Sequence, residues 1–219
     1  MSLDQARSFI ENAKARFERL WIIVLLTAMS LVSFSAHSFA VTPGEHYGGG
    51  IVFYVDATGQ HGLIAAESDI CKPHIDMWGD TFGSKGLLFR WSTGEYKNDK
   101  APDYANGATD TGRAIGTGRS NTKKILSKYP ASLYPNSAAA VASSYSGGGK
   151  HDWFLPSKDE LNELYVQYKK GTVGVFADAF YWSSSEYHEG NAFDQYFVDG
   201  FQYLYIKTGY SRVRPVRAF

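Results

Sequence analysis

The densest group of side chains that could bind a ligand lies near the C-terminal end of the sequence. Within residues 187–210, tyrosines alternate with histidine, asparagine and aspartate, and Glu189 and Lys207 belong to the same cluster. Tyrosine supplies rigid, amphipathic contact area and the polar side chains supply adaptable hydrogen bonds, so this mixture is typical of ligand-binding surfaces. We predict that the binding residues are Tyr187, His188, Asn191, Asp194, Tyr196, Asp199, Tyr203, Tyr205 and Tyr210. A half-exposed sheet with alternating tyrosines would have the same composition without any ligand, and the sequence leaves that alternative open.

No arrangement in the sequence predicts catalysis. Residues 116–118 (GTG) precede a predicted helix, as in a phosphate-binding loop, but no clear strand precedes them and the third glycine is missing. Residues 147–151 (GGGKH) imitate the end of a nucleotide-binding loop, but a strand rather than a helix follows. Cys71 and His74 lie in one predicted loop, whereas catalytic groups are assembled from separate segments. We therefore predict that the chain is not an enzyme.

Metal ligands are equally sparse. The six histidines and the single cysteine form no zinc-binding pattern. Asp99, Asp103, Asn106 and Asp110 place oxygen ligands in one predicted loop, but their spacing is not that of an EF-hand. We expect no cofactor, and calcium is the one metal that the sequence leaves open.

The N-terminal segment has the pattern of an export signal. Residues 1–20 are polar and basic at several positions, residues 20–34 are apolar, and small residues follow, with Ser38 and Ala40 at a suitable cleavage site. The apolar run is also nearly long enough for a membrane anchor, so a cleaved signal and an uncleaved anchor both remain open. Either interpretation places the rest of the chain outside the cytoplasm, in the periplasm, at the cell surface or secreted. We predict a signal peptide or anchor over 1–40 and one binding domain over 41–219.

Charge and cysteine content restrict the partners. Lys plus Arg and Asp plus Glu both number 22, so the chain lacks the basic excess that is typical of nucleic-acid-binding proteins. Cys71 has no second cysteine with which to form an intramolecular disulfide, and we expect it to be buried. We expect a glycan or protein ligand, no nucleic acid, membrane contact only through the N-terminal segment, and self-association as an open alternative.

The order of predicted elements is strands, then helices, then strands, which indicates an α+β fold. The expected core includes Trp91, Trp153, Phe154, Leu155 and Trp182. The predicted elements are a hairpin over 51–67, helices over 122–129, 137–144 and 157–169, and four C-terminal strands within 181–219. We expect Asn121 to cap the first helix and Ser157 with Glu160 to form a capping box.

Three arginines, Arg212, Arg214 and Arg217, lie in the last predicted strand, and we expect them to share a face. They could bind an anionic sugar, but pairing with nearby carboxylates is the favoured interpretation.

Five sequence blocks resemble a known family. They are GGGIVFYVDATGQHGLIAA, IGTGRSNTKKI, DWFLPSKDELNELY, YWSSSEY and RVRPVRAF, in this order over residues 48–219. Together they look like the C-terminal domain of the Legionella collagen-like adhesins, a family related to retroelement-diversified variable proteins. The resemblance implies a C-type-lectin-like fold, binding of sulfated glycans and trimerisation. The chain lacks collagen repeats, the paired cysteines of formylglycine-generating enzymes, and the motifs of calcium-dependent sugar binding, so the ligand does not carry over.

The sequence thus favours an exported adhesin-like or receptor-like module. Two alternatives remain: a structural subunit of a cell-envelope or secretion assembly, and an oxidase of the formylglycine type.

Overall fold

The computed structural model describes residues 41–70, 88–91, 112–188 and 190–219, with five further residues near the N-terminus. The chain divides into two compact units, Met1–Phe39 and Ala40–Phe219. In the first unit Gln5, Arg7, Glu11, Lys14 and Arg16 are helical and exposed. The apolar run over 20–34, Cys71 and the candidate calcium loop lie outside the described residues. Within the described part of the chain, no helix is long and apolar enough to cross a membrane.

One sheet of the second unit joins its first strands to its last. Its antiparallel strands are β1 (His46–Tyr47), β2 (Gly50–Val55), β3 (Gly62–Ala65) and β9 (Val216–Ala218), in the order β1-β2-β3-β9. The predicted hairpin over 51–67 is therefore confirmed as β2 and β3. β9 pairs with β3, with Leu63 opposite Ala218, which confirms that the end of the chain returns to a sheet.

In the described residues after β3 there are three α-helices: α2 (Gly118–Lys128), α3 (Ala138–Ser143) and α4 (Lys158–Lys169). The capping box at Ser157 and Glu160 is confirmed. The prediction for the first helix is wrong at its start, because α2 begins four residues before 122 and Asn121 lies inside it, buried. The Asn121 side chain donates hydrogen bonds to the carbonyl of Gly112 and to Ser184 Oγ instead of capping the helix.

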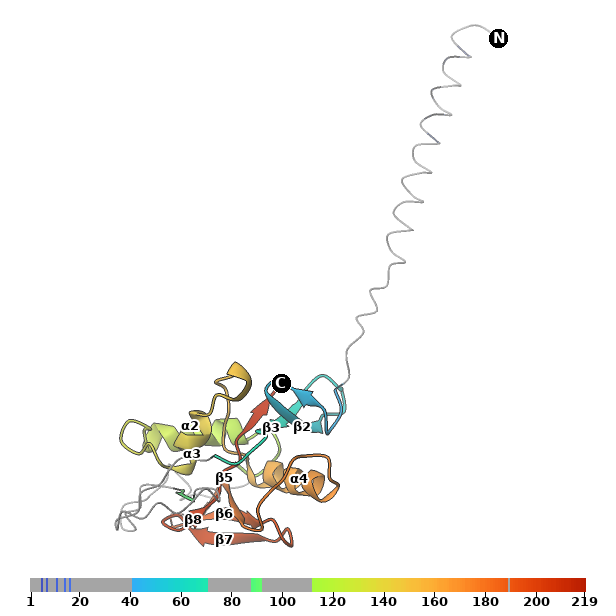
Figure 1. Cartoon of the computed structure of the whole chain (residues 1–219). Helices are drawn as coiled ribbons and strands as arrows, with labels where there is room; N and C mark the ends of the chain where they lie inside the picture. The colour runs from blue at the N-terminus through green and yellow to red at the C-terminus, as the bar shows by residue number, and fades with distance from the viewer. Residues whose placement is uncertain are drawn as a thin grey trace. The chain divides into compact units, whose positions relative to one another are not determined.

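The C-terminal sheet contains β5 (Phe180–His188), β6 (Asn191–Tyr196) and β7 (Gln202–Ile206), in that order. A separate two-stranded sheet pairs β4 (Phe89–Arg90) with β8 (Tyr210–Ser211). Figure 1 shows the three strands of the C-terminal sheet in red, with β7 at the lower border of the domain. The predicted four-strand meander is right for three strands and wrong for the fourth, because β9 leaves this sheet to pair with β3.

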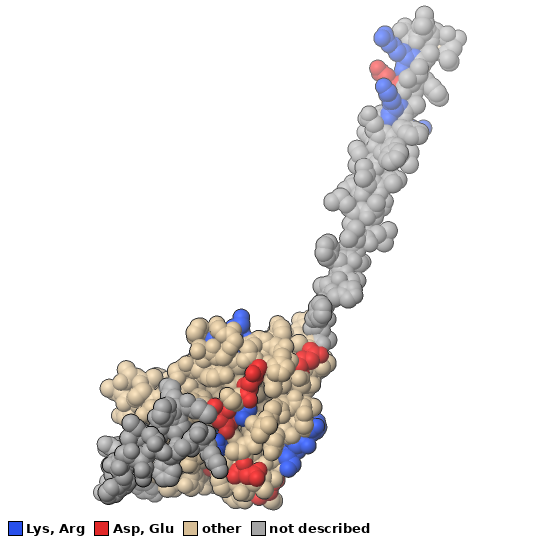
Figure 2. All heavy atoms as spheres, viewed as in Figure 1, with Lys and Arg blue, Asp and Glu red and all other residues tan. Residues whose placement is uncertain are grey.

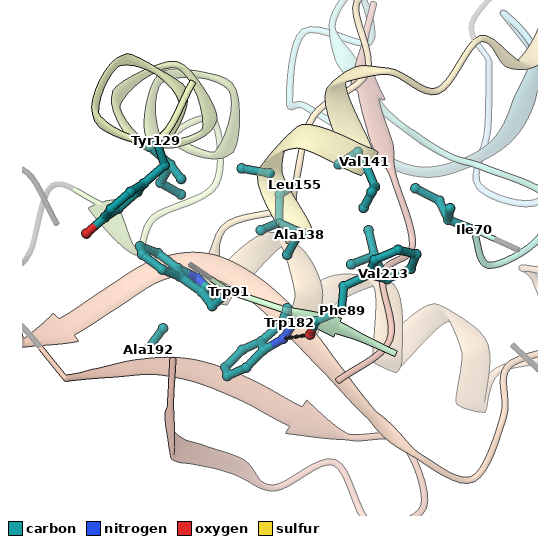
Figure 3. Close-up of a cluster of buried hydrophobic side chains, with 13 residues drawn as sticks. Ile70, Phe89, Trp91, Tyr129, Ala138, Val141, Leu155, Trp182, Ala192 and Val213 are labelled. Carbon is teal, nitrogen blue, oxygen red and sulfur yellow. Dashed lines mark hydrogen bonds between the residues drawn. The ribbon is translucent and has the colours of Figure 1, made fainter. Parts of the chain in front are cut away.

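The core forms on both sides of β5. On one side Trp91 and Trp182 pack with α2, α3 and Leu155, and Trp182 Nε1 donates to the carbonyl of Phe89 at 2.7 Å (Figure 3). On the other side the neighbouring residue Tyr181 packs with Phe197, Phe154 and residues of α4. Because successive side chains of a strand point to opposite faces, adjacent aromatic residues supply both clusters. The predicted core residues are all buried. The combination of helices and antiparallel sheets confirms the α+β class.

The glycines at 147–149, predicted as a flexible break, form a single 3₁₀ turn named η2 (Gly147–Gly149). Gly148 has a φ of 62° and lies against Gly49, where a Cβ atom would come within 2.3 Å of the Gly49 Cα. Two glycine runs from distant parts of the sequence thus allow their backbones to touch, which explains Gly49 and Gly148 by packing.

Candidate functional site

The register of the C-terminal sheet decides which side chains share a face. Asp194 of β6 lies opposite both Trp182 of β5 and Tyr203 of β7, and Ala192 lies opposite Tyr205. Directly opposite residues in an antiparallel sheet point to the same side. This side therefore carries the two tyrosines of β7 beside the buried Trp182.

The exposed part of this side is an aromatic surface, which we call the aromatic face. Its members are Phe180, Tyr196, Phe201, Tyr203 and Tyr205. Phe180 stacks on Tyr196 with ring centroids 4.5 Å apart, and its ring also meets the edge of Tyr203. Tyr203 is 44% exposed and Tyr205 is 40% exposed.

A buried side chain supports one member of this surface, Tyr205, from beneath. The Tyr205 ring lies over Trp182, with centroids 5.6 Å apart. Trp182 is itself fully buried and fixed by its bond to the Phe89 carbonyl. The Tyr205 ring is thus supported from beneath rather than free, which lowers the entropy lost when a ligand binds.

Tyr210, on β8, has a separate support. The guanidinium of Arg90, on the paired strand β4, lies 4.8 Å from the centre of the Tyr210 ring. Such a contact stabilises the ring orientation while leaving Tyr210 41% exposed.

Asp194 does not belong to any exposed site, which corrects the prediction. Its side chain is buried, and Oδ2 accepts a hydrogen bond from Ser211 Oγ at 3.1 Å. Oδ1 is buried without a hydrogen-bond partner in the described residues. Burial raises the pKa of Asp194 to about 7, because removal from water disfavours the charged carboxylate.

Lys207, part of the same predicted cluster, is also buried. It forms an ion pair with Glu186, and its ammonium lies 4.8 Å from the centre of the Trp91 ring. Burial raises the pKa of Glu186, and the charge of Lys207 opposes that shift. Lys207 and Glu186 therefore lie in the interior of the domain and are not available to a ligand. Glu189 lies outside the described residues.

Tyr187 and His188 lie apart from the aromatic face. The Tyr187 ring meets the edge of Phe193, with centroids 5.8 Å apart. Phe193 is the residue before Asp194 on β6, so it points to the opposite side of the sheet. His188 Nδ1 accepts a hydrogen bond from the Gly190 N–H, which shapes the turn into β6. The predicted binding residues are therefore divided between two sides of one sheet.

The remaining predicted residues lie at the ends of the strands. Asn191 is half-buried at the start of β6, and Asp199 is exposed in the β6–β7 turn, where Oδ1 accepts from the Phe201 N–H. Sequence reasoning missed Phe180 and Phe201 as members of the aromatic face. The alternation of Phe201 with Tyr203 and Tyr205 is the signal that could have identified it.

Residues 116–118, weighed as a phosphate loop, already hold an anion from the chain itself. Glu160 Oε1 accepts from the backbone N–H groups of Gly116 at 2.8 Å and Gly118 at 3.3 Å. Glu160 Oε2 accepts from the Ser157 N–H at 2.7 Å. The start of α2 thus has a built-in carboxylate where a phosphate would sit.

The three C-terminal arginines pair with carboxylates, as favoured from the sequence. Arg212 and Arg214 both reach Asp69, whereas Arg217 pairs with Asp152. The expectation that all three share a face is wrong, because Arg217 is an odd number of residues from the other two. In the described ranges, no group of three His, Cys, Asp or Glu side chains could hold a metal ion.

Charge is dispersed over the described residues of one face of the domain (Figure 2). On the face drawn in Figure 2, acidic and basic side chains are interspersed and neither sign gathers into one patch.

Comparison with known proteins gives little support for an assignment. No protein-family model matches the chain, and no curated protein matches it. A fimbrial protein from Bacteroides ovatus is similar to 71% of this chain at 19% identity, with a TM-score of 0.37. The chain spans about a third of that protein's length, since the match covers 35% of it. A TM-score this low carries no argument about the fold or function of the present chain.

Proposed function

We propose that the chain is an exported, non-enzymatic binding module that recognises a glycan or a protein through the aromatic face. The observation that carries the proposal is the pair of exposed rings of Tyr203 and Tyr205. Tyr205 lies over the buried Trp182, and Tyr203 packs against the ring of Phe180. Flat aromatic surfaces beside hydroxyl groups suit the apolar faces and hydroxyl edges of sugars, and they suit protein surfaces equally. Tyr196, Asp199 and Tyr210 complete the proposed contact area.

The proposal includes a C-type-lectin-like fold and a relationship to the collagen-like adhesins. Its support is the order of the sequence blocks and their roles in the α+β domain. The DWFLPSKDEL block supplies Glu160, and the IGTGRS block supplies the amides that Glu160 binds. Two blocks of the resemblance are therefore linked by one set of hydrogen bonds. Export rests on the apolar segment over 20–34.

The test is binding of the purified full chain, in detergent, to an array of sulfated and neutral glycans and host-cell glycoproteins. We expect a bound ligand whose signal is lost in the Tyr203→Ala/Tyr205→Ala variant. Leu133→Ala and Val175→Ala, at residues 70% and 85% exposed elsewhere on the domain, are the matched controls. A ligand that binds the double variant as well as the native chain would overturn the proposal.

The same array with a chelator tests calcium. We expect binding to persist, because the proposed contacts are aromatic and polar side chains of the described sheet. If the folded native chain binds nothing on the array, that result would favour a structural subunit of an envelope assembly over a ligand-binding module.

A further inference from the structure

Among the described residues β7 is the edge of its sheet, and its own sequence and pairing show none of the usual protections of an edge strand. Soluble proteins commonly guard a free edge with charged residues, proline, a bulge or a covering segment. β7 reads QYLYI, with no charge and no proline, and it pairs with β6 without a register shift. On one side of β7, Leu204 and Ile206 are 45% and 42% exposed. On the other side, Tyr203 and Tyr205 are exposed to a similar extent.

The hydrogen-bond pattern shows which backbone groups of β7 are directed outward. The N–H of Lys207 donates to the Gly190 carbonyl at 3.0 Å, which identifies this position as a hydrogen-bonded pair of the ladder. Such pairs alternate along antiparallel strands, so Tyr205 and Tyr203 also bond toward β6. The N–H and C=O of Leu204 therefore point away from the sheet.

We propose that β7 pairs antiparallel with β7 of a second copy of this chain, about a two-fold axis at Leu204. In this register Leu204 lies opposite the second copy's Leu204, and the two residues exchange both outward hydrogen bonds. Tyr203 lies opposite the second copy's Tyr205 on one side, and Gln202 lies opposite Ile206 on the other. The result is a continuous six-stranded sheet.

The sequence of β7 suits its own copy. Across the axis Leu204 meets Leu204 and Tyr203 meets Tyr205, and such aliphatic and aromatic cross-strand pairs are favourable. The pairing brings no like charges together. The net charge of the whole chain is zero, so two copies do not repel each other at long range. A two-fold axis also closes the assembly at two copies, in place of the trimer that the resemblance to the collagen-like adhesins implies, because it uses up the free edge of each β7.

This inference does not depend on the proposed ligand-binding function. Its pairing uses the backbone edge of β7, while ligand binding uses the ring surfaces of Tyr203 and Tyr205. The dimer would nonetheless place two aromatic faces side by side on one surface.

The first test is the mass of the full chain in detergent, measured by light scattering or sedimentation over a range of concentrations. We expect a dimer whose association constant falls at least about tenfold in Leu204→Lys, because two like charges would then face each other. Val175→Lys, at a residue 85% exposed, is the matched control and leaves the association unchanged. The N-terminal segment is identical in all three proteins, so it cannot cause a difference between them.

The second test probes the register. In a Cys71→Ser background, Leu204→Cys places two thiols at a hydrogen-bonded pair, within the range that a disulfide spans. We expect rapid crosslinking of Leu204→Cys on mild oxidation and none for Phe201→Cys, which lies far from its own copy in this register. A monomeric or trimeric native chain, an equal loss of association in Val175→Lys, or equal crosslinking of both cysteine variants would each overturn the proposal.

Discussion

The backbone of Gly118, at the start of α2, donates a hydrogen bond to the carboxylate of Glu160 in α4. The same carboxylate closes the capping box of α4 through Ser157. One side chain therefore satisfies the first turns of two helices, which the chain would otherwise have to cap separately. This explains why Thr117 precedes α2 without a side-chain hydrogen bond to the helix.

Gly118→Ala tests the closeness of this contact. A Cβ atom at residue 118 would lie 2.2 Å from Glu160 Oε2 and 2.9 Å from the Leu155 carbonyl oxygen. We expect a loss of about 1–3 kcal/mol in the free energy of unfolding, measured by urea denaturation. In Gly174→Ala the new methyl group meets only ordinary contacts, at 3.5 Å and beyond, and stability should be unchanged. Equal behaviour of the two variants would contradict the steric argument.

Glu160→Ala removes the shared acceptor. The N–H groups of Gly116, Gly118 and Ser157 lose their partner, and we expect a loss of about 3 kcal/mol. Because the carboxylate is the nearest obstacle to a Cβ at 118, Gly118→Ala should cost less in this background than in the native chain. A double-mutant cycle by urea denaturation measures that coupling, and strictly additive losses would count against it. Glu163→Ala, one turn along α4, is the control, since Glu163 accepts only from Gln167 among the described side chains.

Asp194 makes stability depend on pH. Burial raises its pKa from 3.8 to about 7, so the folded protein holds this proton more tightly than the unfolded chain does. The contribution of this bound proton to the free energy of unfolding is complete below about pH 4. It is lost as the pH rises through 7, a change on the order of 4 kcal/mol. Asp194→Asn should flatten the decline and be more stable than the native chain at about pH 8.

The measurement is urea denaturation between about pH 4 and pH 8. Asp199→Asn removes an exposed carboxylate from the same hairpin and should leave the profile unchanged. Glu186, whose pKa burial also raises to about 7, leaves a residual slope in Asp194→Asn. A native profile without any decline would refute the assignment.

Arg214→Lys tests the buried arginine. Arg214 Nε donates to Asp69 Oδ1 at 2.8 Å, its Nη2 donates to the Val175 carbonyl, and its guanidinium lies 3.9 Å from the centre of the Phe176 ring. An ammonium reproduces neither the planar stacking nor these several bonds, so we expect a loss of about 3 kcal/mol in thermal or urea unfolding. Arg217→Lys should cost less than about 1 kcal/mol, because its partner Asp152 is half exposed.

Local signals in the sequence predicted several parts of this fold. The β2–β3 hairpin, the capping box of α4 and the buried Trp182 follow from turn residues, capping chemistry and hydrophobic spacing. The start of α2 could not be predicted, because its cap comes from Glu160, a residue far along the chain. The placement of β9 beside β3 also depends on long-range pairing that no local pattern encodes.

For the candidate site, composition identified the correct region but could not sort its side chains. Tyr203 and Tyr205 are exposed because β7 is an edge strand. Asp194, with a similar local sequence, is buried because it lies on the central strand β6. Only the register of the three strands separates these cases.

The pairing of β9 with β3 also constrains the order of events during synthesis. Leu63 of β3 leaves the ribosome early, yet its partner Ala218 is made only with the last residues of this sequence. Phe154 depends on the same segment, because its backbone N–H donates to the Val216 carbonyl and its carbonyl accepts from the Val216 N–H. β3 can already pair with β2, but its other edge stays unpaired until synthesis reaches residue 218, so this sheet cannot be completed earlier.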